Sequence, residues 1–305
     1  MRTQGWRAVR GSEGSGADCG RAGLRPVKRA SALAALIALS ACGQQSGAPT
    51  PDTKPKAETK DESKTIRQSA CRADRFEDIP LTVCEADPAR HRIRMDLGPG
   101  DSDGDDNDDG KPYRSLATFA ANHALIASRM AFVVNGGMFD EQGQPVGYYV
   151  EGGKERKALN RNEGPGNFHL LPNGIFYGTG GKWAVQATED FAALEGPAPD
   201  FATQSGPMLV IDGKLHPDIT TDGMSTNIRN GVGVDKQGHA FFVMSDGPLS
   251  FGKLARYFRD KLKTPNALYL DGKVSALWDP ATGRLDSTAP LGPLIVVEQS
   301  GKGTP

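Results

Sequence analysis

The sequence predicts an α+β fold, built on a curved, mixed and mostly antiparallel β-sheet with two main flanking helices. Many short apolar runs lie between residues 79 and 297, which is typical of a domain rich in strands. Only two segments repeat apolar residues at the spacing of an amphipathic helix. The folded part, residues 71–300, has a length that suits one large domain.

Turn-forming pairs separate several of the apolar runs. Asn173-Gly174, Asp212-Gly213 and Asp271-Gly272 each stand between two such runs. These pairs tolerate the positive φ angles that a tight hairpin requires. The sequence therefore predicts hairpins at these places, although Asp271 also qualifies as a site residue at the end of a strand.

The two helical segments are residues 115–129 and 249–262. In the first, Leu116, Phe119 and Ile126 fall roughly on one face, and the second has a similar apolar face. We expect each of them to cover the sheet with that face.

Residues 1–41 are typical of a leader that ends in a secretion signal. Residues 30–41, ASALAALIALSA, follow basic residues and are too short to span a bilayer, which needs about 20 residues. The sequence L-S-A-C that ends at Cys42 resembles a bacterial lipobox, so Cys42 is the expected lipidation site. An ordinary signal that is cleaved near Ala41 is the alternative.

Residues 42–70 are expected to form a flexible tether. They are rich in Pro, Lys, Asp, Glu, Ser and Thr, and such a segment buries too little apolar surface to order itself. Cys71 and Cys84 follow, and in an exported protein the default for such a pair is a disulfide. Two free thiols are the alternative.

The acidic run at residues 100–110, GDSDGDDNDDG, matches only the first half of a calcium loop. A bidentate glutamate is needed at the twelfth position, and Leu116 stands there. We interpret the run as a solvated loop in which Asp101 to Asp109 attract cations weakly, and we expect no cofactor. The net charge of −1 gives no reason to expect a nucleic-acid partner.

Polar, glycine-containing stretches border many of the strand-like runs. One such stretch would be a tight turn, but several in one domain favour a shared cleft, because glycine lets a ligand approach the backbone. The stretches are VVNGGMFD (133–140), GPGNF (164–168), TQSGPML (203–209), NIRNGVGVD (227–235), MSDGP (244–248) and ALYLDG (267–272).

The ordered set of these stretches resembles the phosphodiester glycosidase family. The resemblance rests on VVNGGMF, PVGYYVEGG, GNFHLLPNGIFY, TQSGPMLV, IRNGVGVD and NALYLDGKVSALW, and it covers roughly residues 71–298. It implies an α+β fold and the hydrolysis of a glycosyl phosphodiester. A carbohydrate or a sugar-phosphate polymer is therefore the expected partner.

This chemistry needs a cation or amide donors for the phosphate and a carboxylate for C1 or for the attacking water. Arg229 matches the family's arginine motif and is the phosphate candidate, because a guanidinium binds phosphate in a bidentate fork. Asp271, Asp246 and Glu151 are the candidate catalytic carboxylates, since each ends an apolar run. A surface arginine, turn aspartates and a solvent-facing glutamate are the plainer interpretations.

Asn135 follows four apolar residues, and we assign it to substrate hydroxyl or phosphate contacts. Gly136 and Gly137 would then clear space and offer their N–H groups to an anion. An ordinary Asn-Gly turn is the alternative.

The remaining candidates are binding residues rather than nucleophiles or metal ligands. Ser205 lacks the Gly-x-Ser-x-Gly elbow, so we assign it to substrate binding together with Gln204 and Asn230. No histidine has metal-ligand spacing, and the five histidines are interpreted as mostly structural. His169 is the one that we include among the binding candidates.

The sequence thus predicts an envelope lipoprotein that hydrolyses a sugar-1-phosphodiester or a related glycosidic linkage in cell-envelope or exopolysaccharide material. A non-catalytic binder of glycans or phosphopolymers is the alternative. The expected membrane contact is the lipid anchor. Gly43, where aspartate would favour inner-membrane retention, indicates the periplasmic face of the outer membrane.

Overall fold

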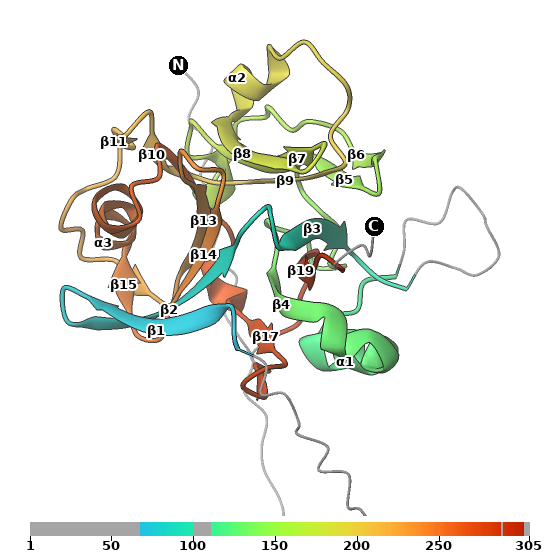
Figure 1. Cartoon of the computed structure of the whole chain (residues 1–305). Coiled ribbons are helices and arrows are strands. Elements are labelled where there is room, and N and C mark those ends of the chain that lie inside the picture. Colours follow the sequence, from blue (N-terminus) through green and yellow to red (C-terminus); the bar gives the residue numbers. More distant parts are fainter. Residues whose placement is uncertain (1–67, 100–110, 288, 302–305) are drawn as a thin grey trace, which may run out of the picture. The chain divides into compact units, whose positions relative to one another are not determined.

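Strands outnumber helices in the described part of the chain, which comprises residues 68–99, 111–287 and 289–301 of a computed structural model (Figure 1). All strand pairs there are antiparallel, and the predicted α+β class is confirmed.

The predicted leader, Cys42, most of the tether and the acidic run lie outside the described residues. Within the described residues, no helix is long and apolar enough to cross a bilayer.

A seven-stranded sheet forms the first layer, and a disulfide joins its two outermost strands on one side. Cys71 and Cys84 lie directly opposite each other and are bonded, in agreement with the expected pairing. In spatial order the strands are β1 (Cys71–Phe76), β2 (Ile79–Ala86), β14 (Ala240–Ser245), β13 (Asn230–Val234), β16 (Asn266–Tyr269), β10 (Met208–Ile211) and β11 (Lys214–Leu215).

Two five-stranded sheets and a short ribbon hold the remaining strands, so the strands do not form one continuous sheet. The first contains β18 (Arg284–Leu285), β17 (Leu277–Asp279), β4 (Met130–Asn135), β19 (Leu294–Gln299) and β3 (His91–Asp96). The second contains β6 (Lys154–Lys157), β5 (Tyr149–Glu151), β9 (Phe201–Ser205), β7 (Gly174–Thr179) and β8 (Lys182–Ala187). The ribbon pairs β12 (Thr226–Asn227) with β15 (Leu249–Ser250).

The main core lies where the three larger sheets meet. Phe132 from β4, Phe176 from β7 and Phe242 from β14 belong to one buried cluster, and the ring of Phe242 contacts both of the others edge-on. This cluster takes residues from all three larger sheets and packs them against one another.

The two predicted helices cover outer faces of these sheets. Helix α1 (Leu116–Asn122) continues as the 3₁₀-helix η1 (Ala124–Arg129) and packs on the sheet that contains β4. Helix α3 (Phe251–Arg256) continues as the π-helix η3 (Tyr257–Lys261) and packs on the seven-stranded sheet (Figure 1). The second helix starts later than predicted because its first two residues form β15.

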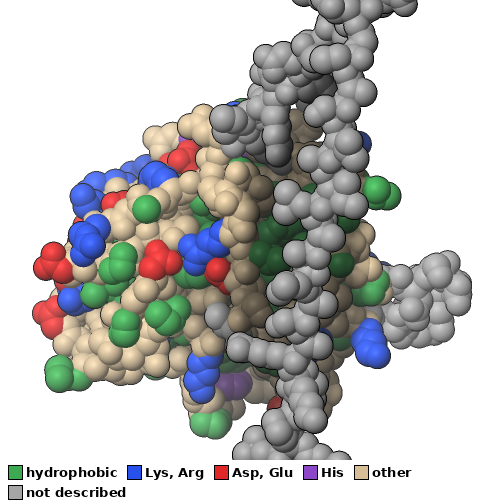
Figure 2. Space-filling model, turned by 90° about the horizontal axis from the view of Figure 1, so that it is seen from below, with side chains coloured by type: hydrophobic (Ala, Val, Ile, Leu, Met, Phe, Trp, Pro, Cys, Tyr) green, Lys and Arg blue, Asp and Glu red, His purple; other side chains and the backbone are tan. Residues whose placement is uncertain are grey.

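Three short helices complete the described structure, namely α2 (Thr188–Ala192), η2 (Asn167–His169) and η4 (Gly272–Val274). On the face that Figure 2 shows, Lys and Arg side chains lie beside Asp and Glu side chains. This mixture agrees with the net charge of −1.

Only one of the three predicted hairpin turns forms. Asp212 and Gly213 have φ angles of 48° and 75° and join β10 to β11. The prediction at Asn173 is wrong, because its buried amide donates to Phe168 O and accepts from the hydroxyl of Thr188. The hairpin at Asp271-Gly272 is also wrong: β16 does not pair with β17, and Asp271 instead begins η4.

Candidate active site

Asn135, the last residue of β4, joins three separate chain segments through its amide. It is 1% exposed, and its Oδ1 accepts hydrogen bonds from Asn230 Nδ2 (2.8 Å) and from the backbone N–H of Ala276 (3.1 Å). Its Nδ2 donates to the carbonyl oxygens of Asp271 (3.3 Å) and Gly136 (3.4 Å). Asn135 therefore does not form the turn that was the alternative prediction. Both atoms of its amide already have partners within the protein, so the predicted contact with a substrate is corrected.

Gly136 and Gly137 pack closely against other strands instead of opening a space. Gly136 N–H donates to Pro293 O (2.7 Å), and Gly137 N–H donates to Thr203 Oγ1 (3.0 Å). A Cβ on Gly137 would lie 2.3 Å from Gln204 O, which no real contact allows. The expectation that these N–H groups face an anion is corrected, since both already have acceptors.

Arg229 places a buried cation directly before β13. The residue is 2% exposed, and its guanidinium carbon lies 3.6 Å from the centroid of the Phe251 ring. Nε donates to Leu249 O (2.8 Å) and Nη2 to Ser225 O (3.3 Å). In the described part of the chain no carboxylate pairs with it. Burial lowers the pKa of Arg229, but a guanidinium keeps its charge at any physiological pH.

Tyr269 links Arg229 to the segment that carries Asp271. Its hydroxyl accepts the N–H of Gly272 (2.8 Å), and its ring centroid lies 5.7 Å from the guanidinium carbon. A Cβ on Gly272 would lie 3.1 Å from Arg229 Cα, so the two backbones are in contact. The arginine and the aspartate segment therefore form one unit.

Asp271 is half-buried, and burial raises the pKa of its carboxyl. The N–H of Lys273, which donates to Asp271 Oδ1 (3.3 Å), and the positive charge of Lys273 oppose this rise. A half-buried carboxyl whose pKa is raised is typical of functional sites, because structural carboxylates are more often paired or solvated. Asp271 stands directly before Gly272, whose backbone packs against that of Arg229.

Strand β9 contributes Gln204 and Ser205, whose polar groups are satisfied within the protein. Gln204 Oε1 accepts from the N–H groups of Tyr148 (2.8 Å) and Asn160 (3.0 Å), and Nε2 donates to Asn160 O (2.7 Å). Ser205 Oγ donates to Leu270 O (2.9 Å). Both residues hold the site together rather than facing a substrate, which corrects their predicted binding roles.

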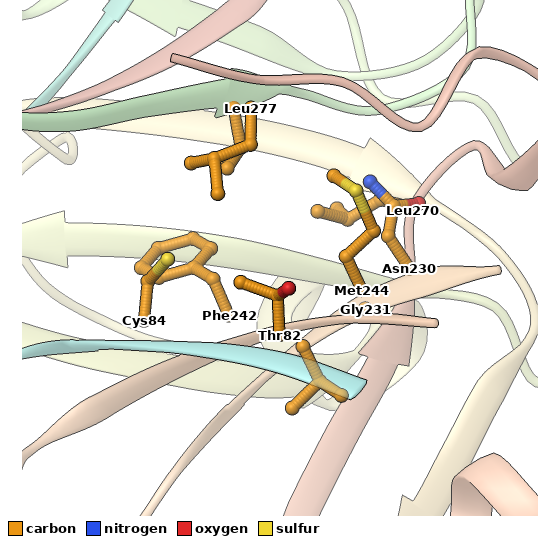
Figure 3. A pocket seen from close by; sticks show the side chains of 10 residues that line it. Thr82, Cys84, Asn230, Gly231, Phe242, Met244, Leu270 and Leu277 are labelled. Carbon is orange, nitrogen blue, oxygen red and sulfur yellow. The ribbon is translucent and has the colours of Figure 1, made fainter. Parts of the chain in front are cut away.

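Asn230, the first residue of β13, lines a small cavity between its own sheet and Leu277 of β17 (Figure 3). The N–H of Ala276 fixes the orientation of Asn135, so Asn230 must turn its Nδ2 toward Asn135 Oδ1. Asn230 Oδ1 is left buried without a donor in the described part of the chain. Asn230 thus supports Asn135, and its predicted substrate contact would require a donor from outside the chain.

Glu151 lies elsewhere, in a group with Tyr149 and Asp96. The Tyr149 hydroxyl donates to Glu151 Oε2 (2.8 Å). Burial raises the pKa of Glu151, and the nearby Asp96 raises it further, whereas Tyr149 and Arg156 oppose the rise. Burial also raises the pKa of Asp96, against the effect of Arg94. Because no contact links Glu151 to Arg229 or Asp271, its predicted catalytic role at this site is corrected.

We expect Glu151→Gln to flatten the pH dependence of stability without lowering activity. The pKa of Glu151 is above 4.5 in the folded state, so the folded protein holds the proton more tightly than the unfolded chain. The free energy of unfolding should therefore fall as pH rises from about 4.5 through the raised pKa. Urea unfolding at several pH values should show a smaller fall in Glu151→Gln than in wild type. The matched control is Glu155→Gln, an exposed change on β6 that should leave the fall intact.

Two other predicted site residues make their hydrogen bonds to other partners, although Ser245, which precedes Asp246, bonds to the backbone of Arg229. Asp246 accepts from the Thr82 hydroxyl (2.8 Å) and from Arg284 Nη2 (3.4 Å), as part of a polar group between two sheets. His169 belongs to η2, and its Nδ1 lies 2.7 Å from Asn162 O. Their predicted catalytic and binding roles find no support in the geometry.

The structure thus brings together Asn135, Gly137, Ser205, Arg229, Asn230 and Asp271. Sequence reasoning missed Tyr269, Phe251 and Ser225, which contact Arg229. Strand alternation could have found Tyr269, since it stands two residues before Asp271 and shares its face. The described residues contain no cluster of three or more side chains suited to a metal ion.

Comparisons with known proteins identify the family and the fold of this chain. A family model described as phosphodiester glycosidase matches residues 128–290, which is more than half of the chain. The uncharacterized protein YigE of Escherichia coli (strain K12) is 36% identical over 184 residues, or 59% of this chain and 72% of that protein.

A solved structure shares the fold. It is the catalytic domain of the zebrafish N-acetylglucosamine-1-phosphodiester alpha-N-acetylglucosaminidase, auto-inhibited by its pro-peptide. The match has a TM-score of 0.52 and 15% identity, and it covers 75% of this chain and 82% of that one. From the family match and the identity with YigE we conclude that the chain belongs to the phosphodiester glycosidase family.

Proposed function

We propose that the protein hydrolyses the glycosidic bond of a sugar-1-phosphodiester in cell-envelope or exopolysaccharide material. The observation that carries the proposal is Arg229, a buried guanidinium without a carboxylate partner in the described part of the chain. Burying an unpaired charge is costly, so such a cation favours an anionic ligand. Membership of the phosphodiester glycosidase family supports a phosphate as that anion.

The reaction breaks the bond between C1 of the sugar and the bridging phosphate oxygen. Water adds its hydroxyl group to C1, and the second proton of that water ends in solution or on the phosphomonoester. The transition state resembles an oxocarbenium ion at C1, and Asp271 would stabilise it or accept a proton from the water. Arg229 would neutralise the charge that grows on the leaving phosphate.

Arg229 must exchange protein contacts for substrate contacts to do this. Its Nη2 donates to Ser225 O at 3.3 Å, which is long for such a hydrogen bond, and Ser225 is exposed. Phosphate oxygens accept a charged hydrogen bond more strongly than a neutral carbonyl does. The exchange of Ser225 O for a phosphate oxygen is therefore favourable once a substrate arrives.

The experiment is the release of free sugar from a model sugar-1-phosphodiester by the purified folded domain. We expect Arg229→Ala to lower kcat/KM by roughly 10²- to 10³-fold, as is typical when an electrostatic contact to the transition state is removed. Arg229→Lys keeps the charge but loses the fork, so its activity should be intermediate. Arg259→Ala, which removes a half-buried arginine paired with Asp260, is the control and should match wild type.

Equal activity of Arg229→Ala and wild type would rule out the assignment of Arg229. Tight binding of the substrate without sugar release would instead support a non-catalytic binder of glycans or phosphopolymers. The two measurements, affinity and turnover, should be made on the same preparations so that a loss of folding is recognised.

We further propose that the mature protein is anchored by a lipid on Cys42 at the periplasmic face of the outer membrane. The support is the L-S-A-C sequence after a short apolar run, with Gly43 rather than aspartate behind it. Metabolic labelling with a fatty acid should mark the wild type but not Cys42→Ser, and labelled protein should fractionate with outer membranes. A soluble, unlabelled wild-type protein would contradict the anchor.

A further inference from the structure

A surface groove runs between β3, which is the last strand of its sheet, and the sheet that contains β7, β8 and β9. Its larger hollow has a volume of about 740 Å³. A smaller hollow of about 390 Å³ adjoins it, because Pro88, Gly181 and Trp183 line both. Sites for small ligands span about 300–1,000 Å³, so the two hollows together suit an extended ligand.

The groove lies at the opposite ends of the strands from the candidate active site. On β9, Ser205 belongs to that site, and Phe201 at the other end of the strand lines the groove. On β19, Leu294 pairs with Asn135, and Glu298 lines the groove. Four residues separate the two places on each strand, which is about 13 Å at about 3.3 Å per residue. The groove is therefore distinct from the candidate active site.

Asp200 fixes the two glycine turns that border the larger hollow. Its backbone N–H donates to Gly178 O (2.7 Å), and its carbonyl accepts from Gly153 N–H (2.8 Å). Its carboxylate accepts from Gly180 N–H (2.8 Å). A Cβ on Gly153 or Gly181 would stand in open space, so both turns leave room for a ligand beside their backbone.

Charges of both signs line the groove. In the larger hollow, Arg94 Nε lies 2.9 Å from Glu298. Arg92 is exposed there, and its guanidinium has no acceptor among residues 68–99, 111–287 and 289–301. Lys236 and Asp235 line the smaller hollow. A polyanion or a polycation would meet like charges along this groove, so a ligand that both donates and accepts hydrogen bonds is the better match.

Trp183 stands where the two hollows join. It is 8% exposed and forms part of the wall of both. Gly178 packs against its indole, since a Cβ there would lie 2.9 Å from Trp183 Cδ1. A sugar ring presents C–H groups on its faces and hydroxyl groups at its edges, and each hydroxyl both donates and accepts. An aromatic side chain among charged groups of both signs matches these properties.

We propose that this groove binds the sugar units of a polymeric substrate, as a second carbohydrate site distinct from the site of hydrolysis. The choice of a glycan as the occupant rests on the proposed function. A polymer held in the groove meets the candidate active site as part of the same complex. Its effective concentration there is then higher than in free solution.

The first test is binding of the purified protein to an array of bacterial envelope glycans and exopolysaccharides. Wild type should bind at least one of them, and Arg92→Ala/Asp200→Asn should bind it at least about tenfold more weakly, since hydrogen bonds to charged groups are lost. Asparagine at position 200 still accepts from Gly180 N–H, so the turn should form. The matched control, Arg259→Ala/Asp260→Asn on η3, should bind as wild type.

Trp183 provides a readout inside the groove. The sequence contains only three tryptophans, so in Trp6→Phe/Trp278→Phe the fluorescence comes from Trp183 alone. A glycan that fills the groove should shift this emission. Binding that Arg92→Ala/Asp200→Asn retains in full, with unchanged Trp183 emission, would place the glycan elsewhere and overturn the inference. Absence of binding to every glycan of the array would overturn it too.

Cleavage is measured separately, on a sugar-1-phosphodiester of methanol that is too small to reach the groove. The kcat/KM of Arg92→Ala/Asp200→Asn for this methyl diester should equal that of wild type. A loss of cleavage as large as the loss of glycan binding would assign both residues to catalysis and overturn the inference. If wild type does not cleave the methyl diester but binds a glycan in the groove, the proposed hydrolysis fails and the glycan site stands.

Discussion

Replacing Asp271 with asparagine is expected to lower kcat/KM for a sugar-1-phosphodiester by about 10³-fold or more, on the scale of losing a catalytic carboxylate. The change keeps the size of the side chain and an oxygen that can accept from Lys273 N–H, so η4 should still form. What is lost is the negative charge near C1. The measurement is sugar release, together with a thermal melt that shows an unchanged fold.

Asp260→Asn is the matched control for this prediction, because Asp260 is an exposed aspartate that pairs with its neighbour Arg259. Its kcat/KM should stay within a factor of two or so of wild type, since surface changes of this kind alter little. If Asp271→Asn retained wild-type kcat/KM, another carboxylate would have to be sought.

The same carboxyl should determine the acid limb of the pH profile. Burial raises the pKa of Asp271 above 3.8, and the deprotonated form is the one that can stabilise C1 or accept a proton. Activity should therefore fall as pH drops through the raised pKa, at a higher pH than for an ordinary aspartate. A profile of kcat/KM against pH measures this limb directly, and an acid limb at or below 3.8 would contradict the assignment.

The second large effect is on stability, and it comes from Asn135→Leu. Leucine has a similar volume but leaves Ala276 N–H, Asn230 Nδ2 and Asp271 O without their partner in a buried place. Each unpaired buried group costs about 1–3 kcal/mol, so we expect the free energy of unfolding to fall by about 4 kcal/mol. Urea unfolding measures the change, and Tm should fall by roughly 10 °C.

Asn122→Leu on α1 serves as the control for Asn135→Leu. The Asn122 amide makes an exposed hydrogen bond to Thr118 O within the same helix, so the loss should be about 1 kcal/mol or less. A cost for Asn135→Leu that is no greater than this control would show that the three segments hold together without the amide.

The sequence predicts the elements better than the contacts between their ends. The apolar runs and the two helical segments are visible in the local spacing of apolar residues. Ser115 and Ser250 directly precede α1 and α3 and cap them by accepting hydrogen bonds from backbone N–H groups. The pair Asp271-Gly272 misleads because its local pattern equals that of Asp212-Gly213. What distinguishes them is the strand that follows, which pairs with β10 in one case and joins another sheet in the other.

For the candidate site too, local patterns predict individual residues better than the contacts between them. Ordered motifs that resemble those of a known family made Arg229 and Asp271 candidates. They did not reveal that the glycines of Asn135-Gly136-Gly137 avoid collisions with Pro293 and Gln204, since those contacts link residues far apart in the chain. Glu151 likewise ends an apolar strand as Asp271 does, and only its partners Tyr149 and Asp96 set it apart.

The amide of Asn135 links β4, β13 and the Asp271 segment in one hydrogen-bond network. Loosening any of these three segments would disturb the position of Asp271 and the stability of the domain together. Sequence changes that spare this network are then expected in exposed segments such as residues 220–228. Relatives of this chain should accordingly keep the amide at position 135 while that exposed segment differs between them.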